Sequence, residues 1–370
     1  MGNTFITMQN IARQTLMRLH ENLVLPNLCY RDYSSDFSDL GDTIQVKKPV
    51  VLEAKSFKDG DTVQRQDMKE SSVAVKLDKI ATVDVKWGAI EGATNLTEAK
   101  LQTDFIEPAA VALAEKINRD GLALYSQIPG VLGTAGTTPN DLAALSAIRK
   151  YLNKNKAPLT NRRAVWDVEA DAKLSEIPNL TRVSEAGTPQ TLREGEIGRL
   201  FGLDNYMSQG VLEHAVGATG TVLIDGKANA GATSIHVDGL ATAFKVGDRF
   251  TIAGDATSYV VTGAGALETA DQDIEIAPAL QKAAADNAAV TVGGAYTANI
   301  AFHQNAIAFV TRPLMLPKGV EAYVASDEYN GVSVRVYRGF NTETKQEVMS
   351  MDVLYGYKLI YPELACVYMG

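Results

Sequence analysis

Four histidines are the side chains that could act as general bases or metal ligands near neutral pH. They are His20, His214, His236 and His303. The patterns around them predict different structural elements, and none is paired with a serine or cysteine nucleophile. The phosphate-binding GxxxxGKS/T motif and the HExxH and GxSxG motifs are absent. We interpret the histidines as structural or surface residues and predict no catalytic residue, with a hydrolase that lacks a recognisable motif as an alternative.

Two further segments contain residue types that bind phosphate or metal. The glycine-rich segment 130–136 precedes a predicted helix, but it lacks the lysine and the preceding buried strand of a phosphate loop, so it predicts a plain loop. Asp271, Asp273 and Glu275 alternate and could offer oxygens to Ca²⁺, but the glycine and the twelfth-position glutamate of an EF-hand are missing. We favour a solvated strand face and predict no metal and no cofactor.

The two cysteines, Cys29 and Cys366, have no CxxC or comparable spacing, which excludes zinc, iron–sulfur and thioredoxin-like sites. Arg13 and Arg18 interrupt the apolar stretch that a signal peptide needs, and Ile6 does not fit a myristoylation signal. No apolar run approaches the ~18 residues of a membrane span. These features predict a protein that is made and folded in a reducing cytoplasm.

The 370 residues carry 35 lysines and arginines against 44 aspartates and glutamates, a net charge of −9. A chain of this length predicts two or three domains and a core that needs no disulfide or metal. The acidic balance argues against a nucleic-acid reader, which needs a basic face to neutralise phosphates. It is compatible with a protein that lies near DNA without holding it.

The first ninety residues predict an amphipathic helix and then a long β-hairpin. One helical stripe carries Met8, Ile11, Ala12, Leu16, Leu19 and Leu23 and ends at Pro26. A strand pattern starts at Ile44, and apolar residues return at odd positions from Val73 to Trp87, broken only by Lys79. The charged segment 58–72 would be the tip. The hairpin either lies over its own domain or leaves the body and pairs with a neighbouring subunit, and its length favours the second.

The middle of the chain predicts helices. Residues 97–128 predict a long helix in which Pro108 either produces a kink or starts the second of two helices. Thr138 predicts the cap of a further helix with Pro139 at its first position, ending at 155–158. A short buried strand at 164–168 and a short helix at 171–177 follow.

Composition changes at Gly217. Residues 217–294 hold 11 of the chain's 30 glycines, with turn pairs such as Gly247-Asp248 between short β runs. The six runs are 221–224, 234–237, 249–253, 258–262, 274–276 and 290–292. They predict a small all-β barrel or sandwich. Because the flanks 206–214 and 298–311 have patterns typical of the main body, we predict an inserted domain, with 263–273 as its projecting loop.

The C-terminal part predicts a twisted hairpin. Val332, Val334 and Val336 lead to a polar tip at 341–345, the return strand carries apolar residues at odd positions from Met349 to Tyr361, and a last strand covers 364–368. The fold class predicted for the whole chain is α+β.

Three phrases resemble segments of major capsid proteins of tailed double-stranded DNA bacteriophages. They are Leu192–Asp204 with its spaced glycines, Phe302–Phe309, and Met351–Tyr357 followed by Tyr361-Pro362-Glu363. The stretch Val246–Gly254 is similar to the extra domain of coat proteins from the short-tailed Salmonella phage group. The order of the predicted elements agrees with that family along the whole chain.

The resemblance implies a capsid fold of the Hong Kong 97 type. Its parts would be an N-terminal arm (1–35), an extended loop (36–96), a spine helix and peripheral domain (97–160), an axial domain (161–216 and 295–370) and an inserted β domain (217–294). Relatives that crosslink covalently join a lysine to an asparagine. Lys47, Lys48, Lys58 and Lys69 are present in the loop, but no matching asparagine motif is found.

The same resemblance implies a major capsid protein whose pentamers and hexamers close into an icosahedral shell around double-stranded DNA. The implied partners are further copies of the chain, a separate scaffolding protein, a portal, a possible decoration protein, and packaged DNA bound without sequence specificity. Its implied location is the virion, after assembly in the host bacterial cytoplasm. The alternative is another self-assembling or glycan-binding structural protein, such as a surface-layer or tail component.

Overall fold

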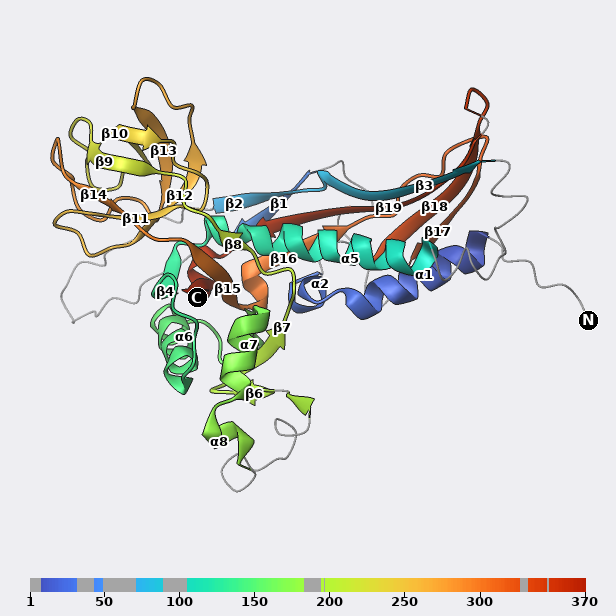
Figure 1. Ribbon diagram of the computed structural model, residues 1–370, viewed down its shortest axis with the longest axis horizontal. Helices are drawn as coiled ribbons and strands as arrows, with labels where there is room; N and C mark the ends of the chain where they lie inside the picture. The colour runs from blue at the N-terminus through green and yellow to red at the C-terminus, as the bar shows by residue number, and fades with distance from the viewer. Residues whose placement is uncertain are drawn as a thin grey trace, which may run out of the picture.

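The computed structural model describes residues 8–31, 43–48, 71–88, 105–182, 194–195, 197–326, 332–344 and 346–370. Its secondary structure is mixed α+β, as predicted. Figure 1 shows a long sheet with two helices along it, a second sheet with helices below, and a group of six strands at the upper left.

The long sheet contains the predicted C-terminal hairpin. It is built from β16 (Ile307–Thr311), β17 (Glu321–Ser326), β18 (Ser333–Asn341) and β19 (Gln346–Leu359), with β3 (Lys79–Gly88) also paired to β19. β18 and β19 pair from Arg335↔Asp352 to Asn341↔Gln346, so the polar tip lies where the alternation predicts it. β17 is a strand that the sequence analysis did not anticipate.

Two helices cover one face of this sheet. α1 (Met8–Asn22) buries Ile11 and Leu19. α5 (Glu107–Leu122) buries Ala109, Leu113 and Ile117 and is followed by a 3₁₀ turn, η4 (Ala123–Gln127). Pro108 lies in the first turn of α5, the second of the two predicted arrangements. Residues 1–7 and 97–104 lie outside the described ranges.

The prediction for Pro26 was wrong in detail. α1 already ends at Asn22, and Pro26 lies in the first turn of a short helix, α2 (Leu25–Leu28). The amide groups of Val24 and Leu25 both donate to the Oδ1 atom of Asn118 on α5. The break between α1 and α2 leaves these two amides without a helical acceptor, and the side chain of Asn118 accepts their hydrogen bonds instead.

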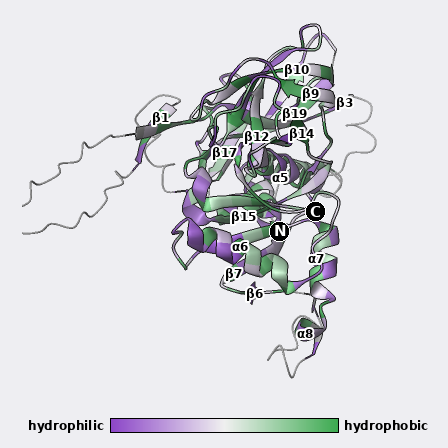
Figure 2. Ribbon diagram, turned by 90° about the vertical axis from the view of Figure 1, so that its left-hand side faces the viewer, coloured by the Kyte–Doolittle hydropathy of each residue, from purple (hydrophilic) through white to green (hydrophobic). Residues whose placement is uncertain are grey.

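The predicted long hairpin divides into two parts. β1 (Thr43–Lys48) pairs with β2 (Ser71–Lys76), but the chain leaves this ribbon at residues 77–78 and β3 then runs along β19. The ribbon lies on its own body, because Val46 and Val75 share an apolar cluster with Ala308, Val310 and Ile360. Figure 2 shows β1 at one side of the body. Residues 49–70, which include most of the tip predicted at 58–72, lie outside the described residues.

The second sheet has the order β4 (Gly130–Gly133), β20 (Ala365–Met369), β15 (Tyr296–His303), β5 (Arg162–Trp166), β7 (Leu203–Met207) and β6 (Arg199–Leu200), with β8 (Glu213–His214) also on β15. The plain loop predicted at 130–136 was wrong, because Val131 and Leu132 pair in parallel with Val367 and Tyr368. A single strand of four residues is too short to show a period in sequence.

Both helix starts near this sheet differ from the prediction. α6 (Leu142–Lys154) is capped by Asp141, whose carboxylate accepts from the amide of Ala143, and not by Thr138. The strand predicted at 164–168 ends at Trp166, because Asp167 caps α7 (Val168–Ser175) through the amides of residues 169 and 170. A last short helix, α8 (Pro178–Thr181), follows.

The six strands at the upper left of Figure 1 correspond to the six predicted β runs. They are β9 (Thr219–Ile224), β10 (Ser234–Thr242), β11 (Arg249–Ile252), β12 (Tyr259–Ala264), β13 (Gln272–Ala277) and β14 (Val290–Val292), in the order β14-β11-β12-β13-β10-β9. The two ends meet, because Leu223 bridges Ala289 and the amide of Ile224 donates to Ala288 at 3.0 Å. Residues 219–292 thus form a closed barrel with its own apolar core. We call them the barrel, and the other described residues the body.

Candidate functional site at the joint of barrel and body

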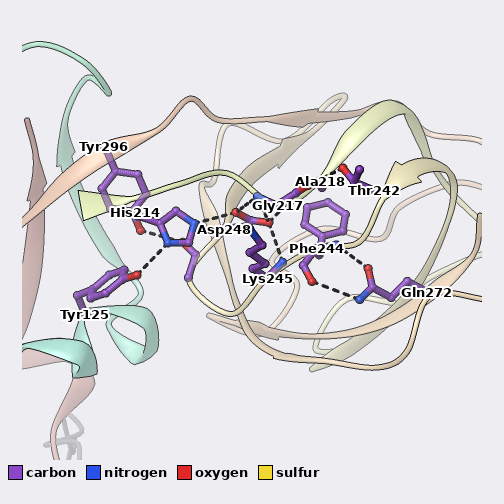
Figure 3. A network of polar contacts seen from close by, with 11 residues as sticks. Tyr125, His214, Gly217, Ala218, Thr242, Phe244, Lys245, Asp248, Gln272 and Tyr296 are labelled. Atoms are coloured by element: carbon purple, nitrogen blue, oxygen red, sulfur yellow. Dashed lines mark hydrogen bonds and ion pairs between the residues drawn. The ribbon is translucent and has the colours of Figure 1, made fainter. Parts of the chain in front are cut away.

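The chain enters the barrel after β8 and returns from it into β15. These two strands are paired, with His214 opposite Tyr296. Five polar side chains meet beside this crossing: Tyr125, His214, Asp248, Arg249 and Tyr296. Figure 3 shows Tyr125, His214, Asp248 and Tyr296. We call the group of five the joint. It is the principal cluster of buried polar side chains between barrel and body among the described residues.

Asp248 lies at the centre of the joint, between the last residue of β8 and the first turn of the barrel. Its Oδ1 atom lies 2.7 Å from Nε2 of His214 and accepts from the amide of Gly217 at 3.0 Å. Its Oδ2 atom accepts from the amides of Ala218 at 3.2 Å and Lys245 at 2.8 Å. Figure 3 shows the carboxylate enclosed by these donors.

The charge of Asp248 is stabilised by its partners. Burial raises the pKa of this carboxyl, but the hydrogen bonds from His214 and from the amides of Lys245 and Gly217 outweigh burial, so the pKa lies below its usual value. The carboxylate is ionised at neutral pH and needs every one of these donors. A buried carboxylate with this many donors fixes the positions of the groups that donate to it.

His214 connects this carboxylate to the body. Its Nδ1 atom lies 2.8 Å from the hydroxyl oxygen of Tyr125 on η4. With the proton on Nε2, the imidazole donates to Asp248 and accepts from Tyr125, which satisfies both ring nitrogens in the neutral form. Burial raises the pKa of Tyr125 to about 12, so its hydroxyl keeps the proton that it donates.

Arg249 and Tyr296 close the other side of the joint. Nη2 of Arg249 donates to the carbonyl of Ile128 at 3.0 Å, and the guanidinium lies 5.8 Å from the ring centre of Tyr296. The hydroxyl of Tyr296 donates to the carbonyl of Gly247 at 2.8 Å. Asp248, in the turn before β11, and Arg249, the first residue of β11, thus contact different parts of the body.

The joint has the residue types of a proton relay, but its geometry is that of a structural contact. The side chains of His214 and Asp248 are 5% and 0% exposed. A substrate therefore cannot reach them, and the Tyr125 hydroxyl is protonated and already bonded. The interpretation of His214 as a structural histidine agrees with these contacts. What the arrangement can do is hold the barrel in one orientation on the body.

The other histidines lie in different elements, as predicted: His20 in α1, His236 in β10 and His303 in β15. His236 is half-exposed, and its hydrogen bond to Asp273 at 2.7 Å raises its pKa. Burial and the nearby Arg162 and Arg163 lower the pKa of His303, whose Nδ1 accepts from the amide of Asn305. None lies beside the joint.

The acidic residues considered for calcium lie on the barrel. Asp273 and Glu275 point outward from β13, while Gln272, Ile274 and Ile276 between them are buried, which is the alternation of a solvated strand face. Within the described ranges no group of three or more histidine, cysteine, aspartate or glutamate side chains could hold a metal ion. The projecting loop predicted at 263–273 contains the end of β12 and the start of β13, joined by a bridge between Glu268 and Asp271.

Of the lysines considered for crosslinking, Lys47 and Lys48 lie on β1, and the ammonium of Lys48 is 5.3 Å from the ring centre of Tyr361. Lys58 and Lys69 lie outside the described residues. No helix in the described ranges is both long enough and apolar enough to span a membrane.

Sequence analysis identified His214 as a structural histidine and Gly247-Asp248 as a turn pair but did not connect the two. The contact between His214 and Asp248 spans 34 positions and depends on the closure of the barrel. Adjacent charged residues beside a turn are ordinarily exposed, so the burial of Asp248 and Arg249 is visible only in the structure.

No family model matches this chain, and no curated protein matches it. Solved structures do. A chain from Mycobacterium phage Che8 is 17% identical with a TM-score of 0.54, over 94% of this chain and 90% of that one. A chain from the capsid structure of cyanophage P-SCSP1u is 11% identical with a TM-score of 0.50, over 94% and 88%. The chain therefore has the fold of phage capsid proteins.

Proposed function

We propose that this chain is the major capsid protein of a tailed bacteriophage and that it forms the shell of the virion. The observation that carries the proposal is the fold, which matches a chain of a phage capsid structure along 94% of the present sequence. The proposed role is structural, with no catalytic residue and no cofactor.

In the proposed shell the chain forms pentamers and hexamers that close around double-stranded DNA. The net charge of −9 supports the enclosure of DNA, because an acidic wall repels phosphates and leaves packaged DNA free to move. The proposed partners are other copies of the chain, a separate scaffolding protein, a portal and a decoration protein. Within the subunit, we propose the Hong Kong 97 arrangement of parts, with residues 217–294 as an inserted domain.

The joint supports this role in one further respect. A shell is built from many copies of one subunit, so any freedom between barrel and body would be repeated at each position. The enclosed carboxylate of Asp248, with donors from both sides of the crossing, removes that freedom. We propose that the barrel acts as a fixed brace of the body.

The test is negative-stain electron microscopy with mass analysis of the protein, expressed alone and with a scaffolding protein from the same genome. Regular hollow shells, or isolated pentamers and hexamers, are the expected result. Shells that form only with the scaffolding protein would support the separate scaffold. A monodisperse monomer of one chain under both conditions would overturn the capsid proposal.

A further inference from the structure

Where the long sheet contains residues 346–355 of β19, its two edge strands are β17 and β3, and each is paired with one neighbour. Its order there is β17-β18-β19-β3, because β3 pairs with β19 over residues 346–355 and β18 pairs with β19 over 346–352. Among the described residues, no strand pairs with the outer edge of β17 or of β3. Each edge therefore presents a row of backbone amide and carbonyl groups that can take a further strand.

The two edges have opposite directions. Every neighbouring pair in this half of the sheet is antiparallel, so β17 and β3 run in opposite senses. When a second copy is placed beside the first in the same orientation, its β3 lies antiparallel to β17. Antiparallel pairing is the more stable form of strand association.

The composition of β17 favours a partner at its edge. Its sequence from 321 to 326 contains no proline and no lysine, and Ala322, Tyr323 and Val324 are half-buried apolar residues. Proline and lysine are the residues that usually prevent an edge strand from pairing with another chain. Glu321, the one charge on β17, lies in the row of Arg338, Met349 and Val85, and Asp84 and Lys86 of β3 flank that row on the opposite face. The two edges are thus complementary in direction.

We propose that β17 of one copy pairs antiparallel with β3 of the next copy, so that the long sheet continues across the boundary between subunits. This inference rests on the proposed self-assembly. Because the two surfaces are different, the contact is heterologous, and repeated contacts of this kind close into a ring when the rotation between copies allows it. A strand pair of this kind fastens subunits through backbone hydrogen bonds and needs little apolar surface.

The rows inside the subunit define the register to test first. Val324, Arg335, Asp352 and Thr82 are successive partners across the sheet and so lie on one face. Continuing that row into the next copy without a shift places Val324 opposite Thr82. A shift of two residues either way places Val324 opposite Ile80 or Asp84. Directly opposed residues have the Cα separation that a disulfide requires.

The experiment uses three double variants: Val324→Cys with Thr82→Cys, with Ile80→Cys, or with Asp84→Cys. The native Cys29 and Cys366 are buried and do not interfere. Assembled particles are oxidised mildly and examined on non-reducing gels. We expect one double variant to give a ladder of covalent oligomers and every single variant to stay monomeric on the gel. Dimers from the Val324→Cys single variant would overturn the proposal, because they indicate a symmetric contact.

Hydrogen exchange on the wild-type protein tests the same contact without substitutions. Amides of residues 321–326 should exchange at least tenfold more slowly in assembled particles than in unassembled subunits. Particles that show neither crosslinks nor this protection would overturn the strand pairing and leave the proposed function intact. Failure of the wild-type protein to form any particle would instead overturn the proposed function.

Discussion

The carbonyl oxygen of Lys76 on β2 lies directly against the Cα of Gly356 on β19, so that a Cβ atom at position 356 would collide with it. The backbone of Gly356 has ordinary strand geometry, which any residue can adopt. Glycine is therefore required here by the lack of space for a side chain. At this point the β1–β2 ribbon crosses the long sheet, just before the chain turns into β3. At this point the ribbon and the body are in contact through their backbones.

Replacing Gly356 by alanine should displace the ribbon. We expect the variant to lose about 1–3 kcal/mol of unfolding free energy, the usual cost of forcing a methyl group into filled space. Urea unfolding followed by fluorescence measures it, and hydrogen exchange of residues 43–48 and 71–76 should become faster. Gly339→Ala is the matched control, because its nearest neighbour is a Val320 methyl group 3.7 Å away. Equal stability of both variants would refute the role of the crossing.

Replacing Asp248 by asparagine should weaken the joint. The amide group of asparagine brings a donor to a site where His214 and the amides of Gly217, Ala218 and Lys245 already donate. We expect a loss of about 3–5 kcal/mol, the usual cost of breaking a buried charged network from one side. Thermal unfolding by calorimetry measures it. Glu213→Gln, a change of the same chemistry at an exposed position on β8 beside His214, should cost less than about 0.5 kcal/mol.

Acid should remove the stabilisation of the fold that the ionised Asp248 provides. The pKa of Asp248 is lower in the folded chain than in the unfolded chain, where it is about 3.9. Its contribution to stability is therefore complete above about pH 4 and is lost as the pH falls through the folded value. We expect the difference in melting temperature between wild type and Asp248→Asn to be constant from pH 7 to pH 5 and to shrink below pH 4. A difference independent of pH down to 2.5 would contradict the ionised form.

Removal of the Tyr355 hydroxyl should destabilise the fold more than removal of the Lys79 ammonium, although both groups contact Asp120. The Tyr355 hydroxyl donates to Oδ2 of Asp120 at 2.7 Å from a fully buried ring, while the Lys79 ammonium lies 3.7 Å away and is 42% exposed. We expect Tyr355→Phe to cost about 1–2 kcal/mol and Lys79→Met less than about 1 kcal/mol. Chemical denaturation of both variants at two salt concentrations gives the comparison. A larger, salt-sensitive loss for Lys79→Met would show that the ion pair dominates.

Both cysteines should be unreactive in the folded chain. They are buried, and burial raises the pKa of each thiol to about 12. Since the thiolate is the reacting form, an aromatic disulfide reagent at pH 8 should label neither in native protein and both in 6 M guanidinium chloride. Rapid labelling of either thiol in native protein would show that its surroundings open readily.

Strands were predictable where the chain alternates. The β18–β19 hairpin and the odd positions from Val73 to Trp87 show a period of two, although the second stretch forms two strands, β2 and β3. The six runs of the barrel were recognised as short β runs separated by turn residues, and each contains a strand. Lys79, which breaks that alternation, marks the start of β3 and reaches toward Asp120. The partner of β3 was not predictable, because alternation reveals the buried face of a strand but not its neighbour. β4 and β17 were missed because each is short and lacks charged residues between apolar ones.

Helix starts were predicted with the right residue types at the wrong positions. Thr138-Pro139 and Asp141 both fit a cap, and Asp141 is used because its side chain reaches the amide of Ala143. The joint could not be predicted at all, since the distance between His214 and Asp248 depends on how the barrel closes. Sequence indicates which side chains are able to bond, and the packing of distant elements decides which of them do.

The pairing of His214 with Tyr296 also has a consequence for engineering. The chain leaves the body and re-enters it at two residues that face each other on neighbouring strands, whose Cα atoms are about 5 Å apart. A foreign module whose own ends are equally close could take the place of the barrel without moving β8 or β15. Such a module would also have to supply substitutes for the three barrel groups that bond to the body, which are the carboxylate of Asp248, the guanidinium of Arg249 and the carbonyl of Gly247.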